Sequence, residues 1–270
     1  MTTLTSPARQ QPVVRRRRSR GWVPKQHGSW AMIAVPWIVG LVLAADAGKL
    51  GVARFLLGPA WLLGYLAFNA ATLALKAAPR RRPDYRPALA TYDLSAAVIG
   101  TAAVMAGGLG VLWWAPVGLA LVGLVLWLTN HKRERSLLAG VLSVVAGAGV
   151  GVVTRFWSPA ELSGASPAEL AVLGVTTAYF VGTVLVVKTM IRERGALSYL
   201  IGSIGYHAVL LMTMIALVLA GWLAAPWLAL GLLCLVRAIA EPRYAGRLKP
   251  LPIGLVEILL SSLVIVCLLA

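Results

Sequence analysis

The sequence predicts an all-α membrane protein, a polytopic bundle of about nine transmembrane helices with its N-terminus inside. The chain has 270 residues, of which 59% are hydrophobic and 13% are charged. A soluble domain has roughly 25% charged residues, so about half of the usual charge is missing. Apolar runs of about 20 residues, each long enough to cross a bilayer, recur along most of the chain. The basic residues, which give a net charge of +16, lie mainly in the short gaps between these runs.

The chain begins with a polar stretch, residues 1–22, that is rich in Arg, Pro, Ser and Gln. This composition is typical of a disordered segment. No apolar core with a small-residue cleavage site follows it, so we predict no signal peptide. We expect a basic cytoplasmic tail that touches anionic lipid, followed by a single transmembrane domain over residues 23–270.

Nine apolar stretches follow, separated by gaps that carry Gly, Pro or charged residues. Gly107, Gly108 and Gly110 separate the third stretch from the fourth, and the pairs Ser158-Pro159 and Ser166-Pro167 mark turns in the longest polar gap. The eighth stretch is short, at roughly 22 Å for 1.5 Å per residue. The predicted helices are Gly28–Ala45, Val52–Ala77, Ala88–Ala106, Val111–Thr129, Ser136–Val153, Glu169–Met190, Leu197–Ala220, Pro226–Ala240 and Ile253–Ala270.

The distribution of basic residues predicts the orientation of this bundle. If all nine stretches span, only Lys49, Arg54 and Arg155 of the 25 basic residues fall on the side opposite the N-terminus, which leaves 22 on the same side. Basic loops face the cytoplasm, so the N-terminus is predicted to be inside. Without a span at Pro226–Ala240, the basic segment Arg237–Lys249 would lie outside. Because topology explains the charge, we expect the lipid bilayer as partner and no nucleic acid.

Small residues in the apolar runs indicate how the helices pack. Gly147 and Gly151 lie four residues apart in the fifth stretch, a spacing that favours close helix contact. Cys234 and Cys267 both lie within apolar runs without metal-type spacing. We interpret them as packing residues and expect no disulfide.

Polar groups inside the apolar runs are the candidate site residues, because charge inside a bilayer is costly and usually faces a bundle interior. Asn69, Thr72 and Lys76 share a helix face that leads into an arginine cluster. A cytoplasm-facing cationic pocket is the functional interpretation. Alternatively, the acids pair with inner arginines, the lysines snorkel to lipid headgroups and His207 is an ordinary hydrogen-bonded residue. The candidate ligand-binding residues are Asn69, Lys76, Asp93, Lys188, Arg192, His207 and Glu257.

The sequence lacks the usual catalytic and cofactor motifs. It has no Walker loop, no HExxH, no GxSxG and no GxGxxG after a strand. His27, His131 and His207 are dispersed and predict no metal cluster. We therefore predict neither a metal nor a cofactor.

A polar-aromatic string stands at the entrance of the first helix. Pro24–Trp30 reads PKQHGSW and resembles the opening signature of the YwiC-like family of bacterial integral membrane proteins. Phe68-Asn69 with the following arginines, Thr189–Gly195 and Arg247–Glu257 fit the same family. The resemblance implies a multi-pass protein of the bacterial cytoplasmic membrane, without an established activity. A cap on the first helix is the structural interpretation of the signature residues, Lys25, Gln26, His27 and Trp30.

The nine-helix layout also resembles the UbiA-type intramembrane prenyltransferases. In those enzymes, aspartate-rich motifs at the inner ends of helices 2 and 6 hold Mg²⁺ and a prenyl diphosphate. Asn69 matches the asparagine that opens the first motif, but Ala70 and Leu73 stand where aspartates are expected. Lys188 and Arg192 stand in place of the second motif. Because Mg²⁺ needs oxygen ligands, the resemblance implies a metal-free anion site at most.

Three functions remain open from the sequence. The first is a UbiA-like transferase, or a relic of one, that binds an isoprenoid or lipid whose anionic head is held by Lys76, Lys188 and Arg192, with Asp93 or Glu257 as base or anchor. The second is a proton-coupled transporter of a small anion or amphiphile. In that case His207 or Asp93 would couple the protons. The third is a non-catalytic membrane scaffold whose arginines only orient it.

Overall fold

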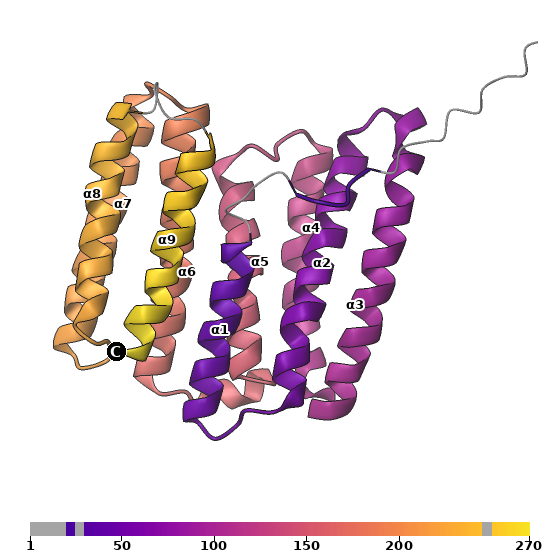
Figure 1. Cartoon of the computed structure of the whole chain (residues 1–270), viewed down its shortest axis with the longest axis horizontal. Coiled ribbons are helices and arrows are strands. Elements are labelled where there is room, and N and C mark those ends of the chain that lie inside the picture. Colours follow the sequence, from indigo (N-terminus) through magenta and orange to yellow (C-terminus); the bar gives the residue numbers. More distant parts are fainter. Residues whose placement is uncertain (1–19, 25–29, 245–249) are drawn as a thin grey trace, which may run out of the picture.

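A computed structural model describes residues 20–24, 30–244 and 250–270, and this part of the chain is helical without a β-strand. The described residues form nine α-helices, which run roughly parallel or antiparallel to one another (Figure 1). The predicted helical bundle is therefore confirmed. The α-helices are α1 (Ala31–Asp46), α2 (Val52–Lys76), α3 (Arg86–Gly107), α4 (Ala115–Asn130), α5 (Leu137–Arg155), α6 (Pro167–Val187), α7 (Leu197–Leu219), α8 (Pro226–Tyr244) and α9 (Pro250–Leu269).

The helices have the length and hydropathy of membrane spans. Six segments of the described chain are long and apolar enough to cross a bilayer, and α1 and the Leu255–Leu269 part of α9 are shorter apolar helices. α8 runs alongside α7 and α9 at the same height (Figure 1). Its 19 residues span about 28 Å. The prediction of a short eighth helix was wrong, because α8 continues through Glu241 to Tyr244.

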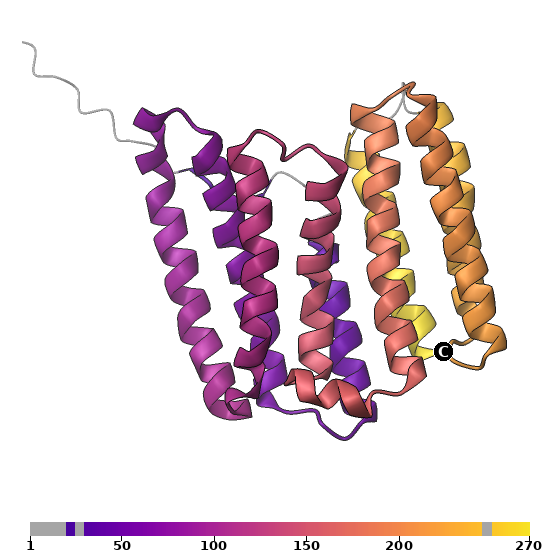
Figure 2. The same ribbon diagram turned by 180° about the vertical axis from the view of Figure 1, so that it is seen from behind.

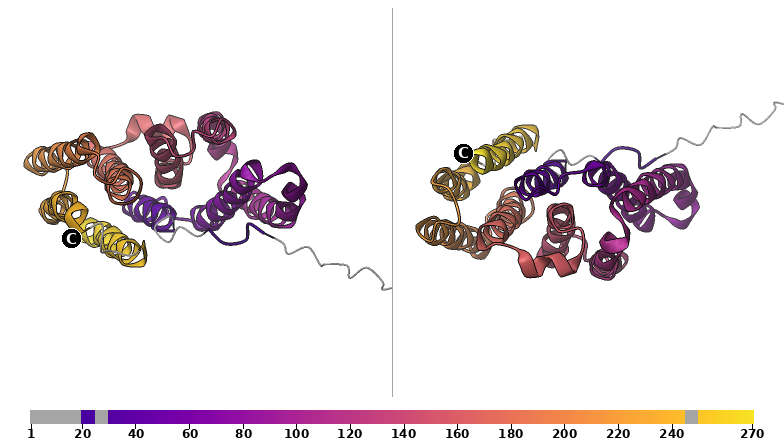
Figure 3. Two further views of the ribbon diagram at one scale, coloured as in Figure 1. Left: turned by 90° about the horizontal axis from the view of Figure 1, so that it is seen from above. Right: turned by 90° about the horizontal axis from the view of Figure 1, so that it is seen from below.

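Two rows of helices make up the bundle. In the end-on views, α8, α9, α1, α2 and α3 form one row, and α7, α6, α5 and α4 form the other (Figure 3). Figure 2 shows the second row from its own side. α1 contacts α2 and α9 in its own row and α5 and α6 in the other row.

Glycines allow α1 and α5 to approach closely. A Cβ on Gly40 would lie 2.5 Å from the carbonyl oxygen of Gly151, and a Cβ on Gly151 would lie 2.5 Å from that of Pro36. A larger side chain at either position would push the helices apart. The structure thus shows the close packing that the Gly147/Gly151 spacing predicted, with Gly151 as the tighter of the two contacts.

Short irregular helices close both ends of the bundle. The 3₁₀ helices η2 (Pro79–Tyr85), η3 (Leu109–Trp114) and η4 (Pro159–Gly164) lie in connections, and α6 ends in the π-helical turn η5 (Lys188–Arg192). The connections that carry η2, residues 131–136 and η5 all lie at the end where α8 stops and α9 starts (Figure 1). These are the basic loops, and we call this end the basic end. The C-terminus lies at the opposite end (Figure 1).

Tryptophan side chains hold the opposite end together. The indole nitrogen of Trp114 donates to the carbonyl of Phe156 at 2.9 Å, and that of Trp157 donates to the carbonyl of Gly108 at 2.9 Å. These bonds join η3 to the end of α5, so the two connections form one packed layer. Within the bundle, Cys234 and Cys267 are buried and unbridged, as expected.

Candidate functional site

A cluster of buried polar side chains lies among α6, α7, α8 and α9. Pairs spaced four residues apart place two polar groups on one face of three of these helices. The cluster lies between the middle of the bundle and the basic end, since α6 and α8 approach that end while α9 starts from it (Figure 1). We call it the α6–α9 polar cluster. Its buried members are Tyr179, Thr183, Ser203, His207, Arg237, Glu257 and Ser261.

An ion pair forms the centre of the cluster. The Nη1 of Arg237 donates to Oε1 of Glu257 at 2.5 Å, and the two residues are only 5% and 4% exposed. The other carboxylate oxygen, Oε2, accepts the hydroxyl of Thr183 at 3.0 Å. One turn away, the hydroxyls of Tyr179 and Ser261 share a 3.2 Å hydrogen bond. Glu257 therefore has a partner on each oxygen.

Within the described residues, Arg237 keeps two donor groups without a partner. Its Nε and Nη2 are buried and have no hydrogen bond to the described residues. Nε and Nη2 form the side edge of the guanidinium, the fork that binds a carboxylate or phosphate through two parallel hydrogen bonds. Leaving such donors buried without a partner is energetically costly. The structure thus leaves this edge of the Arg237 guanidinium unpaired within the described part of the bundle.

A second carboxylate lies beside the same guanidinium. Glu241 follows Arg237 by four residues on α8, is half-buried, and interacts electrostatically with both Arg237 and Glu257. Its Oε2 is buried without a hydrogen-bond partner in the described chain. Arg237 therefore forms an ion pair with Glu257 and also interacts electrostatically with Glu241. One proton or one other cation would balance the charge of the three groups.

His207 packs directly against α6. Its Nδ1 lies 2.7 Å from the carbonyl oxygen of Ser203, whereas its Nε2 is buried without a partner among the described residues. A Cβ on Gly182 would lie 2.7 Å from that Nε2. Glycine at this position is what lets the imidazole fit between α6 and α7. The ring also interacts electrostatically with Arg237.

Two predicted site residues near the basic ends of α2 and α6, Lys76 and Lys188, contact the same loop. Lys76 pairs with Glu134 at 3.7 Å. The Nζ of Lys188 donates to the carbonyl of Arg135 at 2.8 Å and lies 3.7 Å from Glu193. Lys188 is 4% exposed, whereas Arg192 is exposed. Both lysines thus contact residues 134–135, and each has a carboxylate partner.

The other predicted site residues lie apart from the cluster. Asn69 on α2 has a buried Nδ2 without a partner in the described chain, and its carbonyl accepts the hydroxyl of Thr72 at 2.8 Å. Asp93 is exposed on α3, in the opposite half of the molecule from α8 (Figure 3). Of the seven predicted ligand-binding residues, the structure therefore places only His207 and Glu257 within the cluster.

The signature before the first helix is described only in part. Lys25, Gln26 and His27 lie outside the described residues. Trp30 precedes α1, is 37% exposed and makes no side-chain cap hydrogen bond. The end of the predicted tail, Arg20–Trp22, contacts the basic end. The backbone N–H of Arg20 donates to the backbone carbonyl of Asp84 at 3.0 Å. The hydroxyl of Tyr92 donates to the backbone carbonyl of Trp22 at 2.5 Å.

Six residues of the site were missed at the sequence level. Arg237 fell within the predicted eighth helix but was counted with the basic residues of the cytoplasmic side, and Glu241 was assigned to the inner loop, because the helix was ended at Ala240. Their spacing of four residues, on a helix that continues, is the signal that would have found them. The uncharged members give no signal in an apolar run; these are Tyr179, Thr183, Ser203 and Ser261. In the described chain no three His, Cys, Asp or Glu residues gather as in a metal site.

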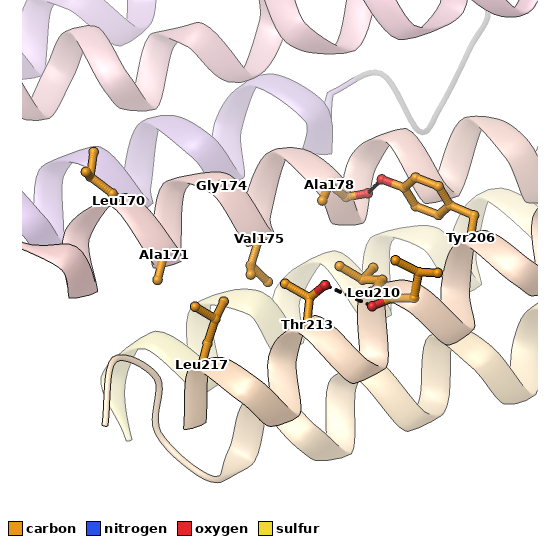
Figure 4. Close-up of a pocket in the computed structure, with 10 residues that line it drawn as sticks. Leu170, Ala171, Gly174, Val175, Ala178, Tyr206, Leu210, Thr213 and Leu217 are labelled. Carbon is orange, nitrogen blue, oxygen red and sulfur yellow. Dashed lines mark hydrogen bonds between the residues drawn. The ribbon is translucent and has the colours of Figure 1, made fainter. Parts of the chain in front are cut away.

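An apolar groove lies between α6 and α7, away from the basic end. It has a volume of about 240 Å³ and includes Leu170, Gly174, Val175, Leu210 and Leu217. Its polar side chains are internally bonded: the Tyr206 hydroxyl donates to Ala178 at 2.8 Å and the Thr213 hydroxyl to Val209 at 2.9 Å (Figure 4). A hydrocarbon chain suits such a surface, and a polar solute does not.

Comparison with known proteins places the chain in one protein family. A family model described as YwiC-like protein matches residues 23–155. The protein YwiC of Bacillus subtilis, described as uncharacterized, is 30% identical over 203 residues, which are 74% of this chain and 79% of that protein. An uncharacterized protein of Haemophilus influenzae is 28% identical over 92% of this chain and 97% of its own length. No solved structure matches the chain, and the UbiA-type resemblance gains no support.

Proposed function

The chain belongs to the YwiC-like protein family, and we propose that it is a proton-coupled carrier of a small organic anion. Its place would be the cytoplasmic membrane of a bacterium, with the basic end inside. The free fork of Arg237 is the observation that carries this proposal. A buried guanidinium edge with two unbonded donors favours a carboxylate or phosphate ligand.

Electrostatics supports the coupling to protons. Glu257 pairs with Arg237, and Glu241 interacts electrostatically with both, so these three groups carry one negative charge in excess when both carboxylates are ionised. A bound anion would add a further negative charge in a medium where unbalanced charge is expensive. Protonation of one carboxylate offsets this cost. The anion and the proton therefore bind together more readily than either binds alone.

Packing supports access from the basic end. The outer half of the α6–α9 helices is filled by buried apolar side chains, among them Leu210, Met214, Trp227 and Val264. Glu241 lies on the other side of Arg237, nearer the basic end of α8. A carrier must open to each side in turn, and the described arrangement fits the state that is closed toward the outside.

Solute accumulation in proteoliposomes tests the proposal. A panel of labelled acetate, lactate, succinate and phosphate is offered with an imposed pH gradient. We expect gradient-dependent accumulation of at least one of them, lost in Arg237→Lys and retained in Arg192→Lys. Lysine keeps the charge but lacks the fork. Uptake that is equal in both variants, or that is absent for the whole panel, would contradict the proposal.

Binding of an anionic amphiphile at the basic end is a second candidate. It is supported by the exposed Arg192 and by the contacts of Lys76 and Lys188 with the same loop. Mass spectrometry of purified protein should then detect a copurified lipid with a phosphate or carboxylate head, reduced in Arg192→Gln. Equal lipid content in the variant and the parent protein would count against this candidate.

A further inference from the structure

A polar pocket lies at the end of the bundle opposite the basic loops. It has a volume of about 420 Å³ and lies where the end of α1, the end of α5 and the start of α6 meet. Volumes of this size are usual for small-molecule sites. Leu43, Ala47 and Val172 form its apolar side, and Asp46, Arg155 and Glu169 supply its charges.

Arg155 supplies a donor that nothing in the described chain uses. The residue is 6% exposed, and its Nε donates to a carboxylate oxygen of Glu169. Its Nη1 is buried and has no hydrogen-bond partner among the described residues. The other oxygen of Glu169 accepts the backbone N–H of Ser166 at 2.8 Å. Glu169 is therefore occupied on both oxygens, and Arg155 keeps a spare donor.

Asp46 supplies an unbalanced negative charge at the same pocket. It is the last residue of α1, where the helix dipole disfavours an anion. It is exposed and makes no ion pair within the part of the chain that the structure describes. Lys49, three residues on, instead pairs with Glu161 at 2.9 Å. A cationic group in the pocket would relieve the charge of Asp46.

We propose that this pocket binds a small zwitterion, with its anionic group toward Arg155 and its ammonium group toward Asp46. Arg155, which carries the spare donor, and Asp46, which makes no ion pair in the described chain, both line this pocket, and the two residues favour opposite charges on one solute. The apolar side contacts the carbon chain between these charges. This site is independent of the α6–α9 polar cluster and of the function proposed for it.

Calorimetric titration of the full-length protein in detergent tests the site. The probes are glycine and γ-aminobutyrate as zwitterions, with acetate and methylammonium as ions of single charge. We expect at least one zwitterion to bind and both single-charge ions to bind at least about tenfold more weakly, because each makes only one charged contact.

The variants separate recognition from folding. Asp46→Asn alters an exposed side chain and should weaken zwitterion binding by about tenfold or more. Glu161→Gln, which removes a carboxylate from the same end but not from the pocket, should leave binding unchanged. The proposal is overturned if neither zwitterion binds, if a single-charge ion binds equally well, or if Asp46→Asn and Glu161→Gln behave alike.

Discussion

At the scale of single residues, the fork of Arg237 determines which ligands the α6–α9 polar cluster can hold. Replacing Arg237 with lysine keeps the charge that faces Glu257 but removes the Nε–Nη2 edge. Losing one charge-assisted hydrogen bond costs about 1.5 kcal/mol or more, so anion affinity should fall at least about tenfold. Calorimetric titration of the purified variant with the anion found by the uptake screen measures this loss of affinity. Unchanged affinity would show that the fork does not hold the anion.

Gly182 is a second residue whose identity the structure explains. An added methyl group would lie 2.7 Å from Nε2 of His207 and 3.2 Å from a ring carbon of Tyr206. Overpacking of this kind costs about 1–3 kcal/mol. Gly182→Ala should therefore lower the thermal unfolding midpoint in detergent. Gly174→Ala on the same helix meets nothing within 4 Å and is the matched control. Equal midpoints for the two variants would refute this account of Gly182.

The candidate site could be predicted only as far as charge reveals it. Glu257 and His207 stand out in apolar runs, and both proved to be buried in the cluster. Lys76 and Lys188 stand out equally, yet each lies beside a carboxylate of the connecting loops. Which polar groups meet depends on how nine helices pack in two rows. No single stretch of sequence contains that information.

At the scale of elements, the start of α6 shows how local sequence determines a helix end. The hydroxyl of Ser166 accepts the N–H of Glu169 at 3.2 Å, and the Glu169 carboxylate accepts the N–H of Ser166. Ser166→Ala should cost about 1 kcal/mol and lower the unfolding midpoint. Ser158→Ala is the comparison, since Ser158 precedes η4 without a side-chain cap bond. A midpoint for Ser166→Ala no lower than that of Ser158→Ala would contradict the cap.

Helix number was predictable from the sequence, whereas several helix ends were not. Long apolar runs identify spans, because few other structures bury 20 such residues. The end of α8 was placed at Ala240, since Glu241 and Arg243 read as a polar loop, but the helix continues to Tyr244. α4 begins at Ala115 rather than Val111, because η3 takes up the preceding residues. Charged residues alone therefore do not mark the end of a helix.

At the scale of the whole molecule, the orientation predicted from the basic loops can be measured. Cys234 and Cys267 are buried, so replacing both with alanine leaves a background for single cysteines. A membrane-impermeant maleimide should label Ser163→Cys on η4 in intact cells. It should label Arg81→Cys on η2 only after permeabilisation. The reverse pattern would place the basic end outside and would exclude the positive-inside orientation.

The two halves of the bundle differ in their polar content. Arg237, Glu257 and His207 all lie in the α6–α9 half, whereas Asn69 and Asp93 lie on α2 and α3. The proposed transport thus depends on four helices, and the remaining helices support them. Asp93 supplies a control residue for measurements of proton coupling, because it is a carboxylate on a membrane-spanning helix far from the cluster (Figure 3).

Proton movement driven by an anion gradient tests the central claim most directly. Proteoliposomes with a pH-sensitive dye inside are given an inward gradient of the transported anion, without an imposed pH gradient. We expect the interior to acidify with the parent protein and with Asp93→Asn, and not with Glu257→Gln. Anion entry without any pH change in the parent protein, or acidification that survives in Glu257→Gln, would contradict a carrier in which Glu257 takes part in proton coupling.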